Sequence, residues 1–138
     1  MDTPRIVLDT NCLIQILGAK TKYHFLFSEF LKGNYILCIS TEILLEYEEI
    51  LCQKASTEAA DLFLKVIARS RNVIQKDPFF RLEIIKADED DNKFVDCAFA
   101  CQADFIVTND KHFDEVTNSP FPHIQVLSLD EFSSLIRP

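Results

Sequence analysis

The chain has 138 residues, a mass of 15.9 kDa and a formal net charge of −8 at pH 7. Its two glycines leave no room for a glycine-rich phosphate loop, and neither common nucleotide-binding pattern occurs. The acidic charge argues against a general nucleic-acid binder, because neutralising phosphates requires Lys and Arg. No apolar stretch approaches the ~18 residues of a membrane span, and the N-terminus lacks the layout of a signal peptide. We therefore expect one globular domain over residues 1–138, with no membrane segment.

The apolar residues predict strands and helices in alternation. In chain order, we expect a strand at 6–8, helices at 11–17 and 23–31, a strand at 35–39, helices at 41–53 and 57–68, a strand at 72–75, a helix at 88–101, strands at 105–107 and 124–127, and a helix at 130–136. Strands that are apolar throughout and separated by helices indicate a parallel sheet covered on both faces. The predicted fold class is therefore α/β, a three-layer α/β/α sandwich with a mainly parallel central sheet.

Three aspartates are predicted to lie at one edge of that sheet. Asp9 directly follows the strand at 6–8, and Asp110 follows the strand at 105–107 after two intervening residues. Asp91 lies near the start of a helix that comes after a strand. Because ligands bind at the carboxyl ends of parallel strands, these side chains are expected to converge. Taken alone, Asp9 also suits a turn or a helix cap.

The helix predicted at 41–53 offers a further carboxylate. At about 100° per residue, Glu46 and Glu48 fall on opposite borders of its apolar stripe, and periodicity does not choose between them. Both also fit edge charges whose stems cover apolar surface while their heads reach water. Asp96 lies in a helix that is apolar nearly all round, on a different face from Asp91. It suits either a supporting group or an additional ligand.

Carboxylates crowded at one edge repel each other and raise one another's pKa values, and a divalent cation removes that penalty. Oxygen ligands without a cysteine–histidine cluster favour Mg²⁺ or Mn²⁺ over Zn²⁺. Such a site polarises a phosphoryl oxygen and activates water, which is the chemistry of metal-dependent phosphodiester hydrolysis. The five cysteines are predicted to be reduced, buried residues of a cytoplasmic protein. They are Cys12, Cys38, Cys52, Cys97 and Cys101.

Three segments together resemble the PIN-domain nucleases, especially the small stand-alone ribonucleases of toxin–antitoxin pairs. They are IVLDTNCLI at 6–14, CISTEILLEYEEIL at 38–51 and DEDDNKFVDCAFACQADFIVTNDKHF at 88–113. The resemblance runs from Arg5 to about Phe132, and the ordered set of motifs carries it rather than any one of them.

This resemblance implies that the family's metal-binding acids correspond to Asp9, Glu46, Asp91 and Asp110. It places Asn11 and Thr108 at polar positions that orient these acids or their waters, and Asp96 at a position that is often acidic. It implies a parallel sheet between helices and Mg²⁺- or Mn²⁺-dependent cleavage of single-stranded RNA. It also implies a small antitoxin protein as a partner that covers the site.

Two other functions fit part of the pattern. A catalytically silent PIN-like module would bind another protein, but such modules usually lose acids, whereas all four are present here. An aspartyl-phosphate phosphatase of the haloacid-dehalogenase kind also has an aspartate after its first strand. Such enzymes usually place a second acid two residues on, where this chain has Asn11, and Lys111 is a weak candidate for their phosphate-binding lysine.

Some residues have both a functional and a structural interpretation. His112, beside Asp110, fits a general acid, although a surface histidine in a loop is favoured. Tyr23, Phe27 and Phe30 fit a homodimer or antitoxin surface, although a place in the core is favoured.

Overall fold

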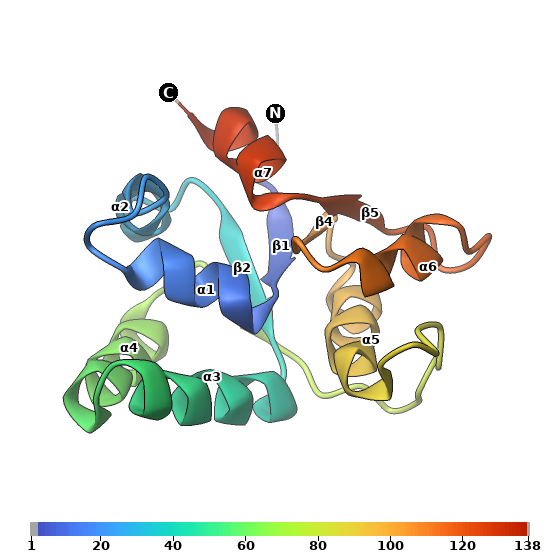
Figure 1. Ribbon diagram of the computed structural model, residues 1–138, viewed down its shortest axis with the longest axis horizontal. Helices are drawn as coiled ribbons and strands as arrows, with labels where there is room; N and C mark the ends of the chain where they lie inside the picture. Colours follow the sequence, from blue (N-terminus) through green and yellow to red (C-terminus); the bar gives the residue numbers. More distant parts are fainter. Residues whose placement is uncertain (1–2, 138) are drawn as a thin grey trace.

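The computed structural model describes residues 3–137 and contains one five-stranded parallel sheet (Figure 1). The strands are β1 (Arg5–Leu8), β2 (Ile36–Ile39), β3 (Val73–Gln75), β4 (Phe105–Val107) and β5 (Gln125–Leu127). Their order across the sheet is β3-β2-β1-β4-β5, and every neighbouring pair is parallel. Each strand lies within one residue of the predicted one at either end, and the predicted fold class is confirmed.

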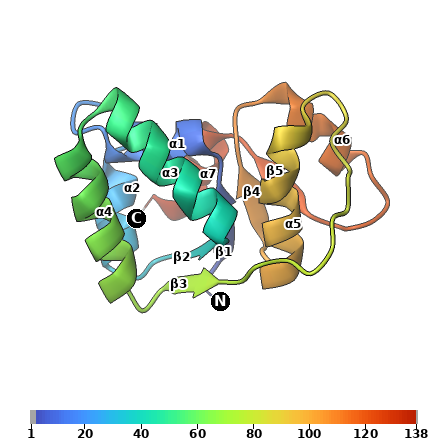
Figure 2. The same cartoon turned by 90° about the horizontal axis from the view of Figure 1, so that it is seen from below.

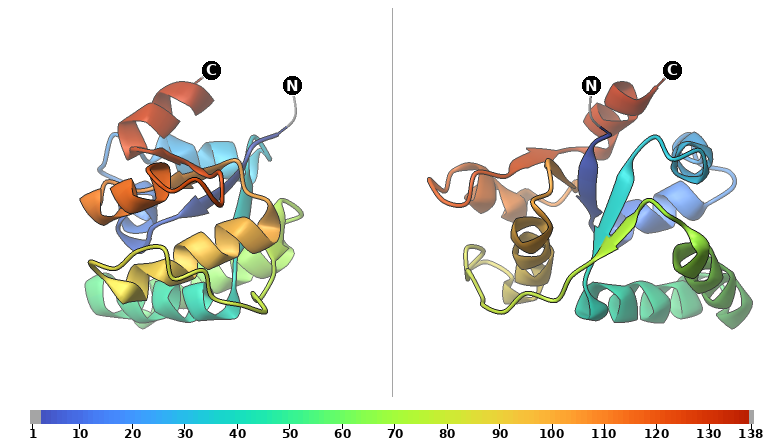
Figure 3. Two further views of the ribbon diagram at one scale, coloured as in Figure 1. Left: turned by 90° about the vertical axis from the view of Figure 1, so that its right-hand side faces the viewer. Right: turned by 180° about the vertical axis from the view of Figure 1, so that it is seen from behind.

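Helices cover both faces of this sheet. They are α1 (Thr10–Leu17), α2 (Phe25–Leu31), α3 (Thr41–Lys54), α4 (Thr57–Arg69), α5 (Asn92–Cys101), α6 (Asp114–Thr117) and α7 (Leu129–Ile136). Helix α5 packs across β1, β2 and β4, and Figure 3 shows α7 on the opposite side of the sheet. Helices α3 and α4 pack against each other (Figure 2). Within residues 3–137, no helix is both long and apolar enough to cross a membrane.

Serine caps explain where several helices begin. The hydroxyl oxygen of Ser40 accepts a hydrogen bond from the backbone N–H of Ile43 at 3.2 Å, and Ser56 caps α4 in the same way. The acidic run at 88–91 departs from the prediction. It forms a single 3₁₀ turn, η1 (Glu89–Asp91), capped by the Asp88 side chain, and α5 begins only at Asn92.

The core lies between the sheet and its helices. Val7, Ile39 and Ile106 are completely buried, as the uniformly apolar strands predict. The hydroxyl of Tyr47, on α3, is buried and donates a hydrogen bond to the carbonyl of Leu8. This bond fixes α3 beside the carboxyl end of β1.

The prediction for the cysteines holds at four of the five positions. Those four are buried, and all five are free thiols. Cys52 is exposed. The buried residues of α3, Ile43, Tyr47 and Leu51, recur at every fourth position. Cys52 follows the last of them and therefore projects about 100° away from the buried stripe.

The connections reverse direction between β1 and β4. From β1 the chain builds outward through β2 to β3, then returns across the sheet to β4 and continues to β5. In an open parallel sheet, the crevice outside the carboxyl ends of strands at such a reversal is the usual position of a ligand site.

The segment at 76–88, between β3 and η1, is irregular and is held by side chains. The carboxylate of Asp77 accepts hydrogen bonds from the backbone N–H and hydroxyl of Thr41 at 2.7 and 2.9 Å. Farther along, Asn92 exchanges two hydrogen bonds of 2.8 Å with the backbone of Ile85. The segment is thereby tied to both α3 and α5, and it ends at Asp88 beside the candidate site.

Candidate metal centre

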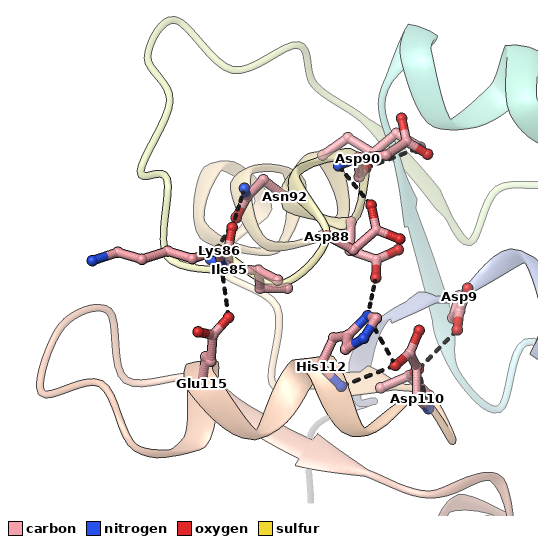
Figure 4. Close-up of polar contacts among 12 residues, drawn as sticks. Asp9, Ile85, Lys86, Asp88, Asp90, Asn92, Asp110, His112 and Glu115 are labelled. Carbon is pink, nitrogen blue, oxygen red and sulfur yellow. Dashed lines mark hydrogen bonds and ion pairs between the residues drawn. The ribbon is translucent and has the colours of Figure 1, made fainter.

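Asp9 and Asp110 meet at the carboxyl ends of β1 and β4, where Thr108 connects them. The hydroxyl of Thr108 donates to Asp9 Oδ2 at 2.8 Å and accepts the backbone N–H of Asp110 at 3.0 Å. The backbone N–H of Asp9 donates to the Val107 carbonyl at 3.0 Å, so the pairing of the two strands continues into the site. Figure 4 shows both aspartates at this edge. The two strand-end aspartates therefore lie together, as the sequence predicts.

The Asp9 carboxyl is only 8% exposed at the residue level. Burial raises its pKa, the hydrogen bond from Thr108 partly offsets this, and the charges of Asp110 and Glu46 raise it further. The Asn11 side chain was expected to orient this acid. Among the described residues it makes no hydrogen bond to Asp9, although both line the same surface pocket. The hydroxyl of Thr108 and the backbone N–H of Asn11 hold the carboxylate, and both hydrogen bonds lower the pKa of Asp9.

Glu46 reaches the site from α3. Its Oε2 accepts a hydrogen bond from the hydroxyl of Thr10, the residue after Asp9, and its Oε1 lies 2.7 Å from the Nζ of Lys93. Its side chain is 24% exposed. Of the two glutamates that periodicity left open, Glu46 is thus the one beside Asp9.

Asp91 projects from η1, immediately before α5. Its Oδ2 is buried and, among the described residues, has no hydrogen-bond partner. Burial raises the pKa of this carboxyl to about 6, together with the charges of Asp88, Asp110 and Asp9, while His112 lowers it. A buried carboxylate oxygen that is left unpaired among other acids is a position that a cation would stabilise.

Lys93 was not identified from the sequence, yet it is the buried cation of this group. Its side chain is 5% exposed, and its Nζ lies 2.8 Å from Asp90 Oδ2 as well as 2.7 Å from Glu46. Nζ also donates to the Asp90 carbonyl at 2.9 Å. Burial lowers the pKa of Lys93, but the hydrogen bonds to Asp90 and Glu46 outweigh it, so the net shift is upward and the ammonium stays charged.

Asp96 does not join the acids. Its Oδ1 accepts the backbone N–H of Leu82 at 3.0 Å, and it is 6% exposed. It therefore braces the irregular segment at 76–88 rather than the strand ends. This position fits the other face of α5 that the sequence predicts for it.

Two further residues at this edge, Asp88 and His112, were not predicted as ligands from the sequence. The possible ligand atoms of Asp88, Asp91 and His112 all lie within 4.8 Å of one another. Figure 4 shows the His112 ring between Asp88 and Asp110. The sequence favoured a surface histidine in a loop. That interpretation agrees with the 43% exposed side chain of His112, but it does not explain why the Nδ1 atom is buried.

The residues present fit a divalent cation. The four acids supply only oxygen atoms, which hard cations prefer. Burial is the main cause of the upward pKa shifts of Asp9 and Asp91, and the charges of neighbouring acids raise both further. Asp91 Oδ2 has no hydrogen-bond partner within the described chain. A cation bound at Asp9, Glu46, Asp91 and Asp110 would relieve both features.

Comparisons with known proteins agree with this fold. The family model described as PIN domain matches residues 5–112. No curated protein matches the chain. Among solved structures, a chain of VapBC2 from Rickettsia felis, bound to a DNA fragment from its promoter, superposes with a TM-score of 0.63 at 18% identity. That match covers 90% of this chain and 98% of the other.

Two further structures are similar. VapC20 from Mycobacterium tuberculosis, a toxin that cleaves the sarcin–ricin loop, gives a TM-score of 0.59 at 15% identity, covering 80% of this chain and 94% of that one. The PIN domain endonuclease Utp24 gives 0.55 at 20% identity, covering 92% and 86%. At such identities the likeness establishes the fold alone.

Proposed function

The chain belongs to the PIN-domain family, and on that premise we propose that residues 1–138 form a divalent-metal-dependent endoribonuclease that cleaves single-stranded RNA. The observation that supports the proposal is that the charges of Asp110 and Glu46 act on Asp9, and those of Asp9 and Asp110 act on Asp91, at the reversal point of the sheet. Within the described residues, Asp91 Oδ2 is buried and has no hydrogen-bond partner. The likeness to VapC20, a toxin that cleaves the sarcin–ricin loop, supports the substrate class.

The four acids would hold Mg²⁺ or Mn²⁺. Such a cation would polarise the phosphodiester and lower the pKa of a water, which is the chemistry that hydrolysis of the bond to the 3′ oxygen requires. The chain's own residues prepare the ligands. Thr108 orients Asp9, while Thr10 and Lys93 fix the two oxygens of Glu46. Because these contacts are already formed, little side-chain freedom remains to be lost when the cation binds.

The surface charge limits how RNA is held. With a net charge of −8, binding must depend on a few local Lys and Arg residues. Lys54 lines the same pocket as Asp9 and Asp110, which makes it one such contact. We expect weak substrate binding that falls steeply as salt is added.

We further propose that the protein is the toxin of a cytoplasmic toxin–antitoxin pair, with a small antitoxin as partner. Similar chains occur in VapBC complexes from Haemophilus influenzae and Salmonella typhimurium and in FitAcB from Neisseria gonorrhoeae. Five free cysteines suit a reducing compartment. A short neighbouring reading frame for a small DNA-binding protein, and co-purification of its product with this chain, would support the pair. A chain that purifies alone and is harmless on expression would oppose it.

The test of the activity is cleavage of single-stranded RNA with Mg²⁺ or Mn²⁺, followed by analysis of the product ends. Hydrolysis of this kind leaves 5′-phosphate and 3′-hydroxyl ends, and EDTA should abolish it. Glu46→Gln should lose at least about a hundredfold in rate, because a metal ligand is removed. Glu48→Gln is the matched control on the same helix and should retain activity.

Two results would count against the proposal. Robust cleavage in EDTA, or products that end in 2′,3′-cyclic phosphate, would show a metal-free route. Absence of cleavage by the folded, metal-loaded protein would favour the PIN-like binding module instead.

A further inference from the structure

The Nδ1 atom of His112 is a buried nitrogen without a hydrogen-bond partner in the described chain. It lies 3.6 Å from Asp91 Oδ2 and 3.4 Å from Asp110 Oδ1. Hydrogen bonds between nitrogen and oxygen are usually close to 2.9–3.0 Å, so these separations are too long for good ones. The nitrogen therefore faces two carboxylates without bonding to either.

The position of His112 is fixed by its neighbours rather than by chance packing of a loop. The short turn η2 (Lys111–Phe113) contains it, and Asp110 Oδ1 accepts the backbone N–H of His112 at 2.9 Å. The next residue, Phe113, is completely buried and packs near Phe94 of α5, with ring centroids 6.3 Å apart. The backbone on both sides of the imidazole is thus anchored.

The spacing suits ligands that share one ion. Adjacent ligands of an octahedral ion with bonds of ~2.2 Å lie ~3.1 Å apart. The observed separations of 3.4 and 3.6 Å need only a few tenths of an ångström of contraction to reach that value. A carboxylate oxygen of Asp88 lies within 4.8 Å of ligand atoms of Asp91 and His112, which is the range of more distant ligand pairs around such an ion.

We propose that His112 is a nitrogen ligand of the divalent cation and, together with Asp91, Asp110 and Asp88, biases the site toward Mn²⁺ over Mg²⁺. The inference rests on the proposed function to the extent that the cation is the one bound by the acids. Imidazole nitrogen binds first-row transition metals well, whereas Mg²⁺ prefers oxygen and retains its waters. A mixed nitrogen and oxygen set therefore discriminates between two ions that an all-carboxylate set treats alike.

The test is pulsed electron paramagnetic resonance of the untagged, Mn²⁺-loaded protein. A directly bound imidazole gives ¹⁴N modulation in the Mn²⁺ signal. We expect this modulation in the wild type and its loss in His112→Asn, with circular dichroism confirming that the variant is folded. His123→Asn is the matched control, because His123 is exposed and lines a pocket that contains none of these acids. It should retain the modulation.

Calorimetric titration gives a second readout. His112→Asn should lose about tenfold or more in Mn²⁺ affinity while its Mg²⁺ affinity changes much less. Mn²⁺ bound without ¹⁴N modulation in the wild type, or modulation unchanged in His112→Asn, would overturn the proposal. RNA cleavage measured on the same samples separates the two ideas. Cleavage without nitrogen coupling would exclude His112 as a ligand and leave the nuclease proposal intact. Nitrogen coupling without cleavage would support His112 as a ligand and oppose the nuclease proposal.

Discussion

At the scale of single residues, the site balances crowded negative charge with one buried lysine. The ammonium of Lys93 pairs with both Glu46 and Asp90, and its side chain is almost completely enclosed. A buried ion pair contributes little net stability compared with an apolar replacement of both partners, but removal of one partner is costly. Lys93 thus keeps Glu46 in place in the metal-free protein.

Lys93→Met should therefore destabilise the metal-free protein by about 1–3 kcal/mol, because Glu46 loses its counter-charge while it remains mostly enclosed. Urea denaturation in EDTA measures the change in the free energy of unfolding. Lys22→Met is the control, since Lys22 and its partner Asp130 have side chains 72% and 70% exposed, and its effect should be much smaller. Equal losses of unfolding free energy in the two variants would show that the buried ion pairs of Lys93 stabilise the protein no more than the exposed pair of Lys22.

Asp91 should make the stability of the metal-free protein depend on pH. Its pKa is about 6 in the folded protein, against about 3.9 for an unperturbed aspartate. Between these values the folded state holds a proton that the unfolded state has released, so stability falls as pH rises from about 4 to about 6. Asp91→Asn has no such proton and should be more stable than the wild type at pH 7 but similar at pH 4. Parallel pH profiles of the two proteins would contradict this account.

At the scale of secondary-structure elements, α5 has two separate tasks. Asp91 immediately precedes its first residue and reaches toward the strand ends, while Asp96, within the helix, anchors the segment at 76–88 through Leu82. The acid before α5 and the brace for the irregular segment within α5 thus have separate partners. A substitution of the brace should leave the acid in place.

Asp96→Ala should lose about 1–2 kcal/mol of stability, because the Leu82 N–H is left without its acceptor. Hydrogen exchange at Leu82 should accelerate, while Mn²⁺ affinity should stay within about a factor of two of the wild type, since Asp96 lies apart from the four acids. Asp96→Asn keeps an oxygen acceptor and should behave nearly as the wild type. A loss of metal affinity in Asp96→Ala, comparable to that in Glu46→Gln, would place Asp96 among the ligands after all.

The elements also show what the sequence could predict and why. Uniformly apolar strands predicted the sheet, and Asp9 and Asp110 come at or just after the ends of such strands, so their meeting could be foreseen. Periodicity could not separate Glu46 from Glu48, because the choice depends on how α3 lies beside β1, and only the resemblance favoured Glu46. Lys93 escaped prediction, and a surface role was favoured for His112, for a similar reason. Their partners, Glu46 and Asp91, are distant in sequence and are brought near only by the packing of α5 and η2.

At the scale of the whole molecule, the topology explains why these acids gather where they do. The chain builds one half of the sheet, crosses back through α5 and builds the other half, so β1 and β4 are neighbours with diverging connections (Figure 1). Asp9 and Asp110 occupy the two strand ends at that point, and α3 and η1 bring Glu46 and Asp91 to the same edge. We propose that these four acids form one divalent-cation site.

The most direct measurement is the melting temperature with and without Mg²⁺ or Mn²⁺, in the wild type and in Asp9→Asn. A cation that binds only the folded protein must raise its melting temperature as the cation concentration rises. We expect that rise in the wild type and its loss in Asp9→Asn, which in EDTA should be as stable as the wild type or more so, because repulsion with Asp110 and Glu46 is removed. An undiminished cation response in Asp9→Asn would show that the ion binds elsewhere and would contradict the account.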